Sequence, residues 1–314
     1  ASALPFLTAD FVDGYRHARI RELLEARQDW CLETVAGLQM DQESLPWRDM
    51  RDAVLKVTVE GDARLAQDLL SAWEGRVAIG SCAATVFELF VDKMGRRIVE
   101  KCAPTMGKFG LGKGFSPLVP KTLFSFQRTI LVVNCLKGGV SLGAEWDWDT
   151  QIAEVLGDVV NDLRGRFGHN PKRWAWGYVR PLTLAHPMAA KWPLKHIYNL
   201  GPLPYGGDAH TLSQGSVDAS DPFASPRLIA SLRMAVNPAD PAQNSYVLPG
   251  GQSGNPLSPN YSDQFDLWKK GGAISIGWNP EDIDQRVTEC LVLERPRRPT
   301  VTASAHLKPA RSAR

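Results

Sequence analysis

Hydrophobic residues recur with the period of an α-helix through the first half of the chain. In residues 62–74, for example, Leu65, Leu69 and Trp73 are four positions apart, and Gly75 follows as a stop signal. The same pattern predicts helices at 15–27, 31–40, 46–57, 62–74, 81–102, 121–137 and 148–164.

The pattern changes near Arg166, where short runs of β-branched and aromatic residues alternate with loops rich in Gly, Pro, Asp and Ser. A chain with helices first and strands later belongs to the α+β class. We therefore divide it into a mainly helical region at 1–165, a β-rich region at 166–295 and a basic tail at 296–314, which we expect to be disordered. The predicted strands are 173–186, 228–236, 244–248, 273–278 and 287–294.

Length and composition are those of a soluble globular protein. The 314 residues suffice for one large domain or two ordinary ones, with 44% hydrophobic and 22% charged residues. A net charge of +2 gives no reason to expect nucleic acid or a membrane as a partner. The apolar runs are far shorter than the roughly 20 residues of a membrane span. The first residues lack an initiator Met and a signal-peptide pattern, so we expect them to be the cut edge of a longer polypeptide.

Residue types that hold metals are scattered along the chain. The five cysteines lack CxxC spacing, and we expect most of them to be buried small apolar side chains. The acidic run at 145–149 offers alternate carboxylates for calcium, but acidic residues at a helix start explain it more simply. The spacing of a zinc-binding helix is also missing among His169, His186, His196 and His210.

Residues 249–268, PGGQSGNPLSPNYSDQFDLW, raise the question of a serine nucleophile. A nucleophile elbow requires Gly-x-Ser-x-Gly between a strand and a helix, but after Ser253 the last glycine is displaced by one and prolines follow. We favour a structural loop in which Gln252 and Ser253 satisfy local backbone groups. Ser262 or Asp263 would then cap the following helix. A serine hydrolase centred on Ser253 is the less favoured alternative.

The run GLGKGF at 110–115 superficially suggests a phosphate-binding loop. It matches neither the P-loop pattern nor the dinucleotide pattern, because Phe115 occupies the sixth position. We therefore predict a flexible basic loop.

Arg16 is the most informative charged residue of the first predicted helix. On a helical wheel it lies one turn before Ile20 and two turns before Leu23, within an apolar stripe. Arg19 falls at the flank of this stripe and Arg21 well outside it, so both are expected to be solvated. A guanidinium directed at a core is costly unless it is paired or faces a polar cavity. Arg16 is therefore predicted to serve a functional site or to form a structural ion pair.

Four segments together resemble successive landmarks of the penicillin acylase family. They occur in that family's order and, with their surroundings, extend from about residue 12 to residue 294. The most specific part is Gly-Gly-Gln-Ser-Gly followed by Ser-Pro-x-Tyr-x-Asp-Gln. The segments are GYRHARIRELLEARQDWCLETVAGLQMD, WEGRVAIGSCAATVFELF, RWAWGYVRPLTLAHP and SLRMAVNPADPAQNSYVLPGGQSGNPLSPNYSDQFDLW.

The resemblance implies an N-terminal-nucleophile hydrolase, made as a zymogen that cleaves itself into an α and a β subunit. The nucleophile would be a serine at the new β N-terminus, with its own amine as general base. Backbone N–H groups and an Asn amide would form the oxyanion hole. The reaction would cleave an acyl-amide bond, as in a β-lactam side chain or an acyl-homoserine lactone. Such an activity belongs to antibiotic biosynthesis or degradation, or to quorum quenching.

The family also implies a four-layer αββα sandwich, which this chain would complete, and a periplasmic or secreted location. The resemblance also implies that no cofactor is required for catalysis. A structural calcium ion is compatible with the resemblance, but no ligand maps onto a numbered residue of this chain.

Residue by residue, the resemblance supports Arg16 as the catalytic candidate, because Tyr15-Arg16 leading to Arg19-Ile20 matches the position of the family's active-site arginine. The serine nucleophile and the oxyanion asparagine would lie upstream of Ala1. The chain then corresponds to the C-terminal half of a β subunit and is expected to be inactive alone.

Its expected partners are the α subunit, the N-terminal half of the β subunit and a small-molecule amide substrate. The sequence departs from the family pattern at Asn237 and Asn260, where we expect Asp and His, without a clear catalytic consequence. The alternative is a non-catalytic assembly or interaction subunit.

Overall fold

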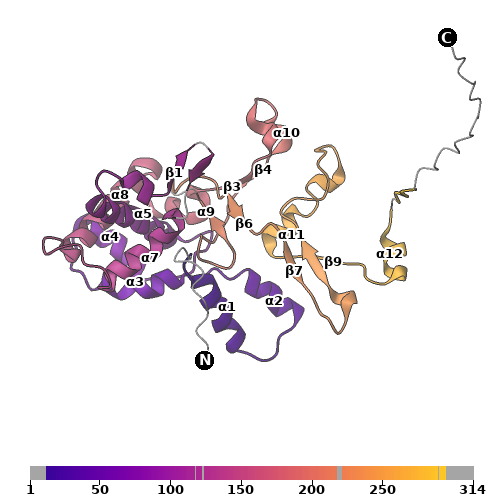
Figure 1. The fold of residues 1–314 in the computed structure, drawn as a ribbon, viewed down its shortest axis with the longest axis horizontal. Coiled ribbons are helices and arrows are strands. Elements are labelled where there is room, and N and C mark those ends of the chain that lie inside the picture. The colour runs from indigo at the N-terminus through magenta and orange to yellow at the C-terminus, as the bar shows by residue number, and fades with distance from the viewer. Residues whose placement is uncertain (1–11, 117, 122–123, 218–220, 289, 295–314) are drawn as a thin grey trace, which may run out of the picture. The chain divides into compact units, whose positions relative to one another are not determined.

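The computed structural model describes residues 12–116, 118–121, 124–217, 221–288 and 290–294. The chain divides into two compact units, Ala1–Ile276 and Gly277–Arg314. The tail predicted at 296–314 lies outside the described residues. The longer helices, all in the first unit, are α1 (Tyr15–Glu25), α2 (Leu32–Gln39), α3 (Leu45–Leu55), α4 (Gly61–Ser71), α5 (Cys82–Cys102), α7 (Phe124–Leu136) and α8 (Trp148–Phe167) (Figure 1).

These seven helices confirm the helical pattern of the first half of the sequence, and their caps explain where they begin. Ser44 Oγ accepts a hydrogen bond from the Trp47 N–H at 3.3 Å, with Pro46 in the first turn of α3. Asp147 caps α8 in the same way, accepting from the Thr150 N–H at 3.1 Å. The acidic run at 145–149 is therefore a helix start, as predicted.

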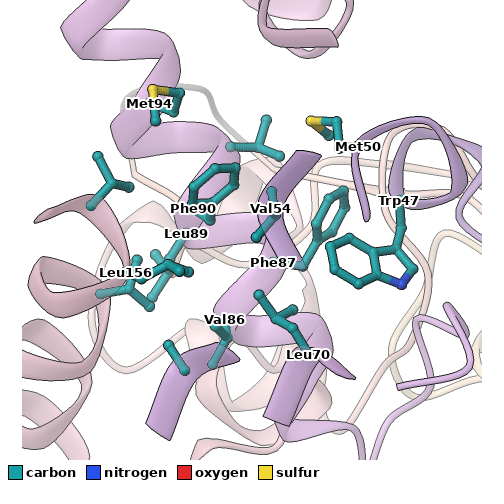
Figure 2. Close-up of a cluster of buried hydrophobic side chains, with 14 of the residues drawn as sticks. Trp47, Met50, Val54, Leu70, Val86, Phe87, Leu89, Phe90, Met94 and Leu156 are labelled. Carbon is teal, nitrogen blue, oxygen red and sulfur yellow. The ribbon is translucent and has the colours of Figure 1, made fainter. Parts of the chain in front are cut away.

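The main hydrophobic core lies among these helices, with α5 packed against α4, α7 and α8. Aromatic rings fill its centre, where Phe87 meets Trp47 edge-on at 5.6 Å between ring centroids. Trp47, Met50, Val54, Leu70, Val86, Phe87, Leu89, Phe90, Met94 and Leu156 are labelled in Figure 2. This core makes the helical half a rigid support for the loops that cross it.

The strands are short and form small antiparallel sheets. The largest has the order β7-β8-β9, with Met234 opposite Tyr246 and Tyr246 opposite Ile274. The others are the pairs β1-β2, β3-β4 and β5-β6. The strand bounds are β1 (Lys113–Ser116), β2 (Val119–Lys121), β3 (Leu182–Leu184), β4 (Leu200–Leu203), β5 (Gly215–Ser216), β6 (Leu228–Ile229), β7 (Arg233–Ala235), β8 (Ser245–Val247) and β9 (Ile274–Ser275).

The mixed α+β class is confirmed, but two predicted strands are largely wrong. Within 173–186 only β3 is extended, because Trp174 and Trp176 turn inward on short helical segments and are fully buried in the helical core. The described part of 287–294 contains no strand. The second unit of the chain, Gly277–Arg314, instead contains the short helix α12, which the sequence pattern did not predict. The remaining short helical segments are α6 (Gly107–Gly110), η1 (Pro171–Trp174), α9 (Trp176–Val179), η2 (Pro187–Ala190), α10 (Lys195–Tyr198), η3 (Pro241–Gln243), η4 (Pro259–Tyr261), α11 (Phe265–Lys270) and α12 (Pro280–Arg286).

A second, smaller core holds the sheets to α11. The rings of Tyr205 and Trp268 stack at 5.3 Å between centroids, and the guanidinium of Arg233 lies 4.7 Å from the centroid of Trp268. Leu182 and Val247 complete its fully buried part. This core fixes β7, which forms one wall of the groove described below.

Candidate functional site

Arg16 lies in the first turn of α1 with its side chain exposed, not in a buried stripe. Its Nη1 donates a hydrogen bond of 3.0 Å to Oε1 of Gln214. The stripe that placed Arg16 toward a core is not covered, since Ile20 is 38% exposed and Leu23 is only half-buried. The helical-wheel expectation was therefore wrong about burial. The sequence pattern identified an apolar face, but the described residues do not cover it.

Arg19, predicted to be solvated, is the buried arginine of α1, and this corrects the sequence analysis. Its Nη2 lies 2.8 Å from Oδ2 of Asp41 and 3.0 Å from Oε2 of Glu43, and its Nη1 lies 3.1 Å from Oε2 of Glu22. The hydrogen bond to Asp41 raises the pKa of Arg19 despite the opposing effect of burial. Arg19 therefore anchors α1 to the segment after α2, and this anchor positions Arg16.

The partner of Arg16 lies on a tight loop, residues 206–216, which we call the Gly-Asp loop. Oδ1 of Asp208 accepts hydrogen bonds from the N–H groups of His210 (2.7 Å) and Thr211 (2.8 Å). Gly207 has φ of +74°, and a Cβ there would lie 1.8 Å from the carbonyl oxygen of Ser213. Only glycine fits that position. This glycine permits the tight turn that leads to Gln214, the partner of Arg16.

His210 ties the Gly-Asp loop to two other segments. Its Nδ1 lies 3.0 Å from Oδ2 of Asp13, just before α1, and its Nε2 lies 2.9 Å from the Thr129 hydroxyl on α7. Burial alone would lower the pKa of His210, but the Asp13 contact and the charges of Asp208 and Asp13 raise it. Burial would raise the pKa of Asp13, yet the His210 contact lowers it. Both shifts favour a charged His210–Asp13 pair.

Behind the Gly-Asp loop lies a small polar cavity of about 60 Å³, lined by Glu88, Arg128, Asp208 and His210, among others. Arg180 is fully buried beside it and donates hydrogen bonds to the carbonyls of Gly215 and Gly207. Burial lowers the pKa of Arg180 to about 10, so its guanidinium stays charged at neutral pH. Ionisable groups are thus concentrated directly behind the loop that presents Gln214.

Arg16 lines an open groove of about 630 Å³. Its walls come from α1, α2, the Gly-Asp loop and β7, and Gln39 Nε2 joins two of them by donating to the Met234 carbonyl at 2.9 Å. Two of its apolar side chains, Leu232 and Met234, are each 49% exposed. The lining residues are Asp13, Arg16, His17, Ile20, Leu38, Gln39, Leu212, Ala230, Leu232, Arg233 and Met234.

The Ser253 segment forms a structural loop. Oγ of Ser253 accepts from the Asn255 N–H at 3.1 Å, and its own N–H donates to the Asn260 carbonyl at 3.0 Å. A Cβ at Gly251 would lie 2.1 Å from that same carbonyl oxygen, so the glycine is required. Gln252 differs from the prediction, because its Nε2 donates to the Tyr246 hydroxyl at 2.5 Å and not to the backbone.

The helix after this loop also starts differently from the prediction. The N-cap of α11 is Gln264, and neither Ser262 nor Asp263 provides a side-chain cap. Oε1 of Gln264 instead accepts from the Leu248 N–H at 2.9 Å. The segment therefore ties β8 to α11, as a rigid loop should. Asn260, where the sequence departs from the family pattern, lies within this loop. Its carbonyl accepts from Ser253, whereas Arg16 bonds to Gln214.

Residues 110–115 lead from α6 into β1. Three of the five cysteines, Cys31, Cys102 and Cys290, are exposed, which corrects the expectation that most are buried. In the described ranges, no three His, Cys, Asp or Glu side chains are arranged to hold a metal ion, so calcium ligands are not assigned. No described helix is long and apolar enough to span a membrane.

Comparison with known proteins gives the family. The sequence profile of the penicillin amidase family matches residues 2–285. The chain belongs to the penicillin amidase family. As a member, it is similar to the acyl-homoserine lactone acylase QuiP of Pseudomonas aeruginosa, with 27% identity over 309 residues, covering 86% of this chain and 35% of that protein. It is also similar to the penicillin acylase 2 proenzyme of Pseudomonas sp. strain SE83, with 26% identity, covering 84% of this chain and 33% of that protein.

A solved structure confirms that this chain has the fold of the family. The thermostable penicillin G acylase of Alcaligenes faecalis superimposes with a TM-score of 0.53 over 90% of this chain and 53% of its own, at 14% identity. The chain spans about a third of the length of the curated relatives it matches.

Sequence reasoning thus selected Arg16 but missed the residues around it. Gln214, His210 and Asp13 carry no spacing signal, because the contacts join positions about 200 residues apart. One signal was present: the Gly-Gly-Asp run at 206–208 is the composition of a tight loop.

Proposed function

We propose that this chain is the C-terminal part of the β subunit of an acyl-amide hydrolase, whose serine nucleophile lies in sequence outside these 314 residues. The family match over residues 2–285 carries the proposal. It is supported by relatives named as acylases of acyl-homoserine lactones and of penicillins, of which this chain spans about a third. The substrate class is an acyl chain joined by an amide bond to an amine.

Arg16 is the residue of this chain that we assign to the reaction. A guanidinium stays charged at any physiological pH and offers five N–H donors. Within the described residues, Gln214 takes one hydrogen bond from Arg16, which leaves donors available to groups from the rest of the protein. In amide hydrolysis, negative charge develops on the carbonyl oxygen as the nucleophile attacks. A fixed positive charge nearby stabilises that oxygen and orients the groups that bind it.

The groove beside Arg16 supports the second part of the proposal, that this chain packs against the rest of the enzyme. Its apolar side chains come from four separate segments, and Ile20, Leu232 and Met234 remain exposed to solvent among the described residues. Exposed apolar surface of this kind marks an interface. We assign it to the N-terminal half of the β subunit, which would complete the αββα sandwich, with the α subunit as further partner. The zymogen route and the periplasmic or secreted location belong to the same proposal.

The test uses the longest reading frame that contains this chain. The purified product should hydrolyse penicillin G or a long-chain acyl-homoserine lactone, and the isolated 314 residues should not. Arg16→Ala should reduce kcat/KM by about 100-fold or more, and Arg16→Lys should recover part of the loss. Arg21→Ala is the matched control, because Arg21 is on the same helix but exposed and paired with Glu25.

Turnover by the isolated chain would overturn the placement of the nucleophile. A full-length product that is correctly folded but inactive on every acyl-amide tested would favour a non-catalytic assembly subunit. Loss of activity on Ser253→Ala, with the fold intact, would support the serine alternative instead. We expect that variant to retain full activity.

A further inference from the structure

The carboxylic acids Glu88 and Asp208 line one small cavity behind the Gly-Asp loop. Glu88 belongs to α5, Asp208 to the loop, and both line the cavity of about 60 Å³. The two carboxyl groups thus share one small cavity, and the charge of Asp208 acts on Glu88. Two ionised carboxylates confined together away from water repel each other strongly, which favours keeping one proton between them.

One carboxylate oxygen of Asp208 lacks a hydrogen-bond donor. Oδ1 already accepts from the N–H groups of His210 and Thr211. Oδ2 is buried and has no hydrogen-bond donor among the described residues, and Asp208 is only 2% exposed. A buried acceptor left without a donor is costly. A protonated Glu88 can supply the missing donor.

The charged side chains around the cavity interact with other groups and do not replace the proposed Glu88 donor. Arg180 donates hydrogen bonds to backbone carbonyls of the loop, and Nη1 of Arg128 lies 2.8 Å from Oδ1 of Asp92, one turn beyond Glu88 on α5. His210, the remaining charged neighbour, is paired with Asp13. Burial raises the pKa of Glu88 well above its ordinary value, and the Asp208 charge raises it further, against weaker opposing effects of Arg180 and Arg128.

We propose that Glu88 shares a proton with Asp208 and thereby acts as a positioning residue for Arg16. The supporting contacts run from this cavity to Arg16: Glu88 and Asp208 line the same cavity, Asp208 accepts from the backbone at His210 and Thr211, and the loop presents Gln214 to Arg16. The proposal rests on the function proposed above only in its last step. The shared proton itself is a property of the folded chain.

Loss of the proton at alkaline pH places two negative charges side by side. The loop then loses its anchor, and Arg16 loses a partner of fixed position. Activity should therefore fall at alkaline pH because the Gly-Asp loop loses its anchor, and not because the nucleophile changes.

The experiment compares Glu88→Gln, which donates a hydrogen bond but does not titrate, with Glu88→Ala, which removes the donor. Both are made in the full-length enzyme, with Glu100→Gln, an exposed site on the same helix, as control. At neutral pH Glu88→Gln should stay within about twofold of the parent kcat/KM, and Glu88→Ala should lose about tenfold. The alkaline limb of the Glu88→Gln profile should move upward by about one pH unit or more. An alkaline limb identical to that of the parent would overturn the positioning role.

A second measurement tests the proton without any catalytic activity. The folded state of the parent holds a proton on this pair that the unfolded chain releases above the ordinary glutamate pKa. Parent stability should therefore decline with rising pH above that value more steeply than the stability of Glu88→Gln. The protonated-carboxyl infrared band of the parent should also disappear in Glu88→Gln. Equal pH slopes together with an unchanged band would overturn the shared proton, whatever the enzyme assay shows.

Discussion

Nη1 of Arg16 donates a 3.0 Å hydrogen bond to Oε1 of Gln214, across 198 positions of the chain. The contact joins the first turn of α1 to the Gly-Asp loop. Arg16 is exposed, so this hydrogen bond does little for stability. Its effect is geometric, because a long flexible side chain receives a defined direction at the edge of an apolar groove.

Gln214→Ala should therefore reduce activity more than stability. Without its partner, Arg16 samples several rotamers, and a mispositioned charge stabilises the transition state less well. We expect kcat of the full-length enzyme to fall about tenfold, with the unfolding midpoint unchanged within error. Gln243→Ala, at an exposed side chain on η3, should leave both values unchanged. Equal activity of the two variants would mean that Gln214 does not position Arg16.

Replacing Arg19 should act in the opposite way, on stability. Arg19→Met leaves Asp41, Glu43 and Glu22 close together without their shared cation. Because these acids are partly exposed, the cost is reduced to roughly 2 kcal/mol of unfolding free energy. Denaturant unfolding measures it. Arg21→Ala, which breaks an exposed pair on the same helix, should cost under about 0.5 kcal/mol.

The His210–Asp13 pair makes stability depend on pH in a defined direction. Because the pKa of His210 is raised in the folded state, the pair stabilises the fold fully at pH values below the ordinary histidine pKa. This stabilisation is lost as pH rises through the folded-state pKa of His210. Because the pKa of Asp13 is lowered, the stabilisation by this carboxylate is lost only when pH falls into strong acid. The stability advantage of the parent over Asp13→Asn should shrink as pH increases from about 6 to about 9. Asp29→Asn, an exposed pair, should show no such trend.

Gly207→Ala should disrupt the Gly-Asp loop. A methyl group there would lie 1.8 Å from the Ser213 carbonyl oxygen at a φ of +74°, so the backbone must move. We expect the unfolding midpoint to fall clearly and the activity to be lost with it. Gly157→Ala on α8 is the control, since a Cβ there meets nothing within 4 Å. It should be neutral or slightly stabilising.

The groove predicts how the isolated chain behaves in solution. The 314 residues alone should bind a hydrophobic dye, and the double variant Leu232→Ser with Met234→Ser should bind less. Leu257→Ser, at an 88% exposed residue of the Ser253 loop, should leave dye binding unchanged. A chain that is monomeric and silent toward the dye would contradict the interface assigned to the groove.

Much of the helical half could be predicted from the sequence, since its apolar periodicity and caps are local. The strands of the second half were harder, as the region around Trp174 and Trp176 shows. Aromatic residues there resemble a strand in composition, but the helical core draws both rings inward. Arg16 was found through family resemblance, while its wheel position gave the wrong burial. The missing information was which surfaces cover α1.

The amino-acid sequence alone was enough to predict most helices, the mixed class and the family, and to single out Arg16 as a candidate. These properties depend on local periodicity or on the order of motifs along the chain. Folding in three dimensions is what buries Arg19 while Arg16 stays exposed, brings Gln214 to Arg16, and places His210 and Glu88 at the cavity behind the Gly-Asp loop. Charge pairing and burial depend on distances in space, and no spacing in the sequence encodes the folding of the Gly-Asp loop against α1, α5 and α7.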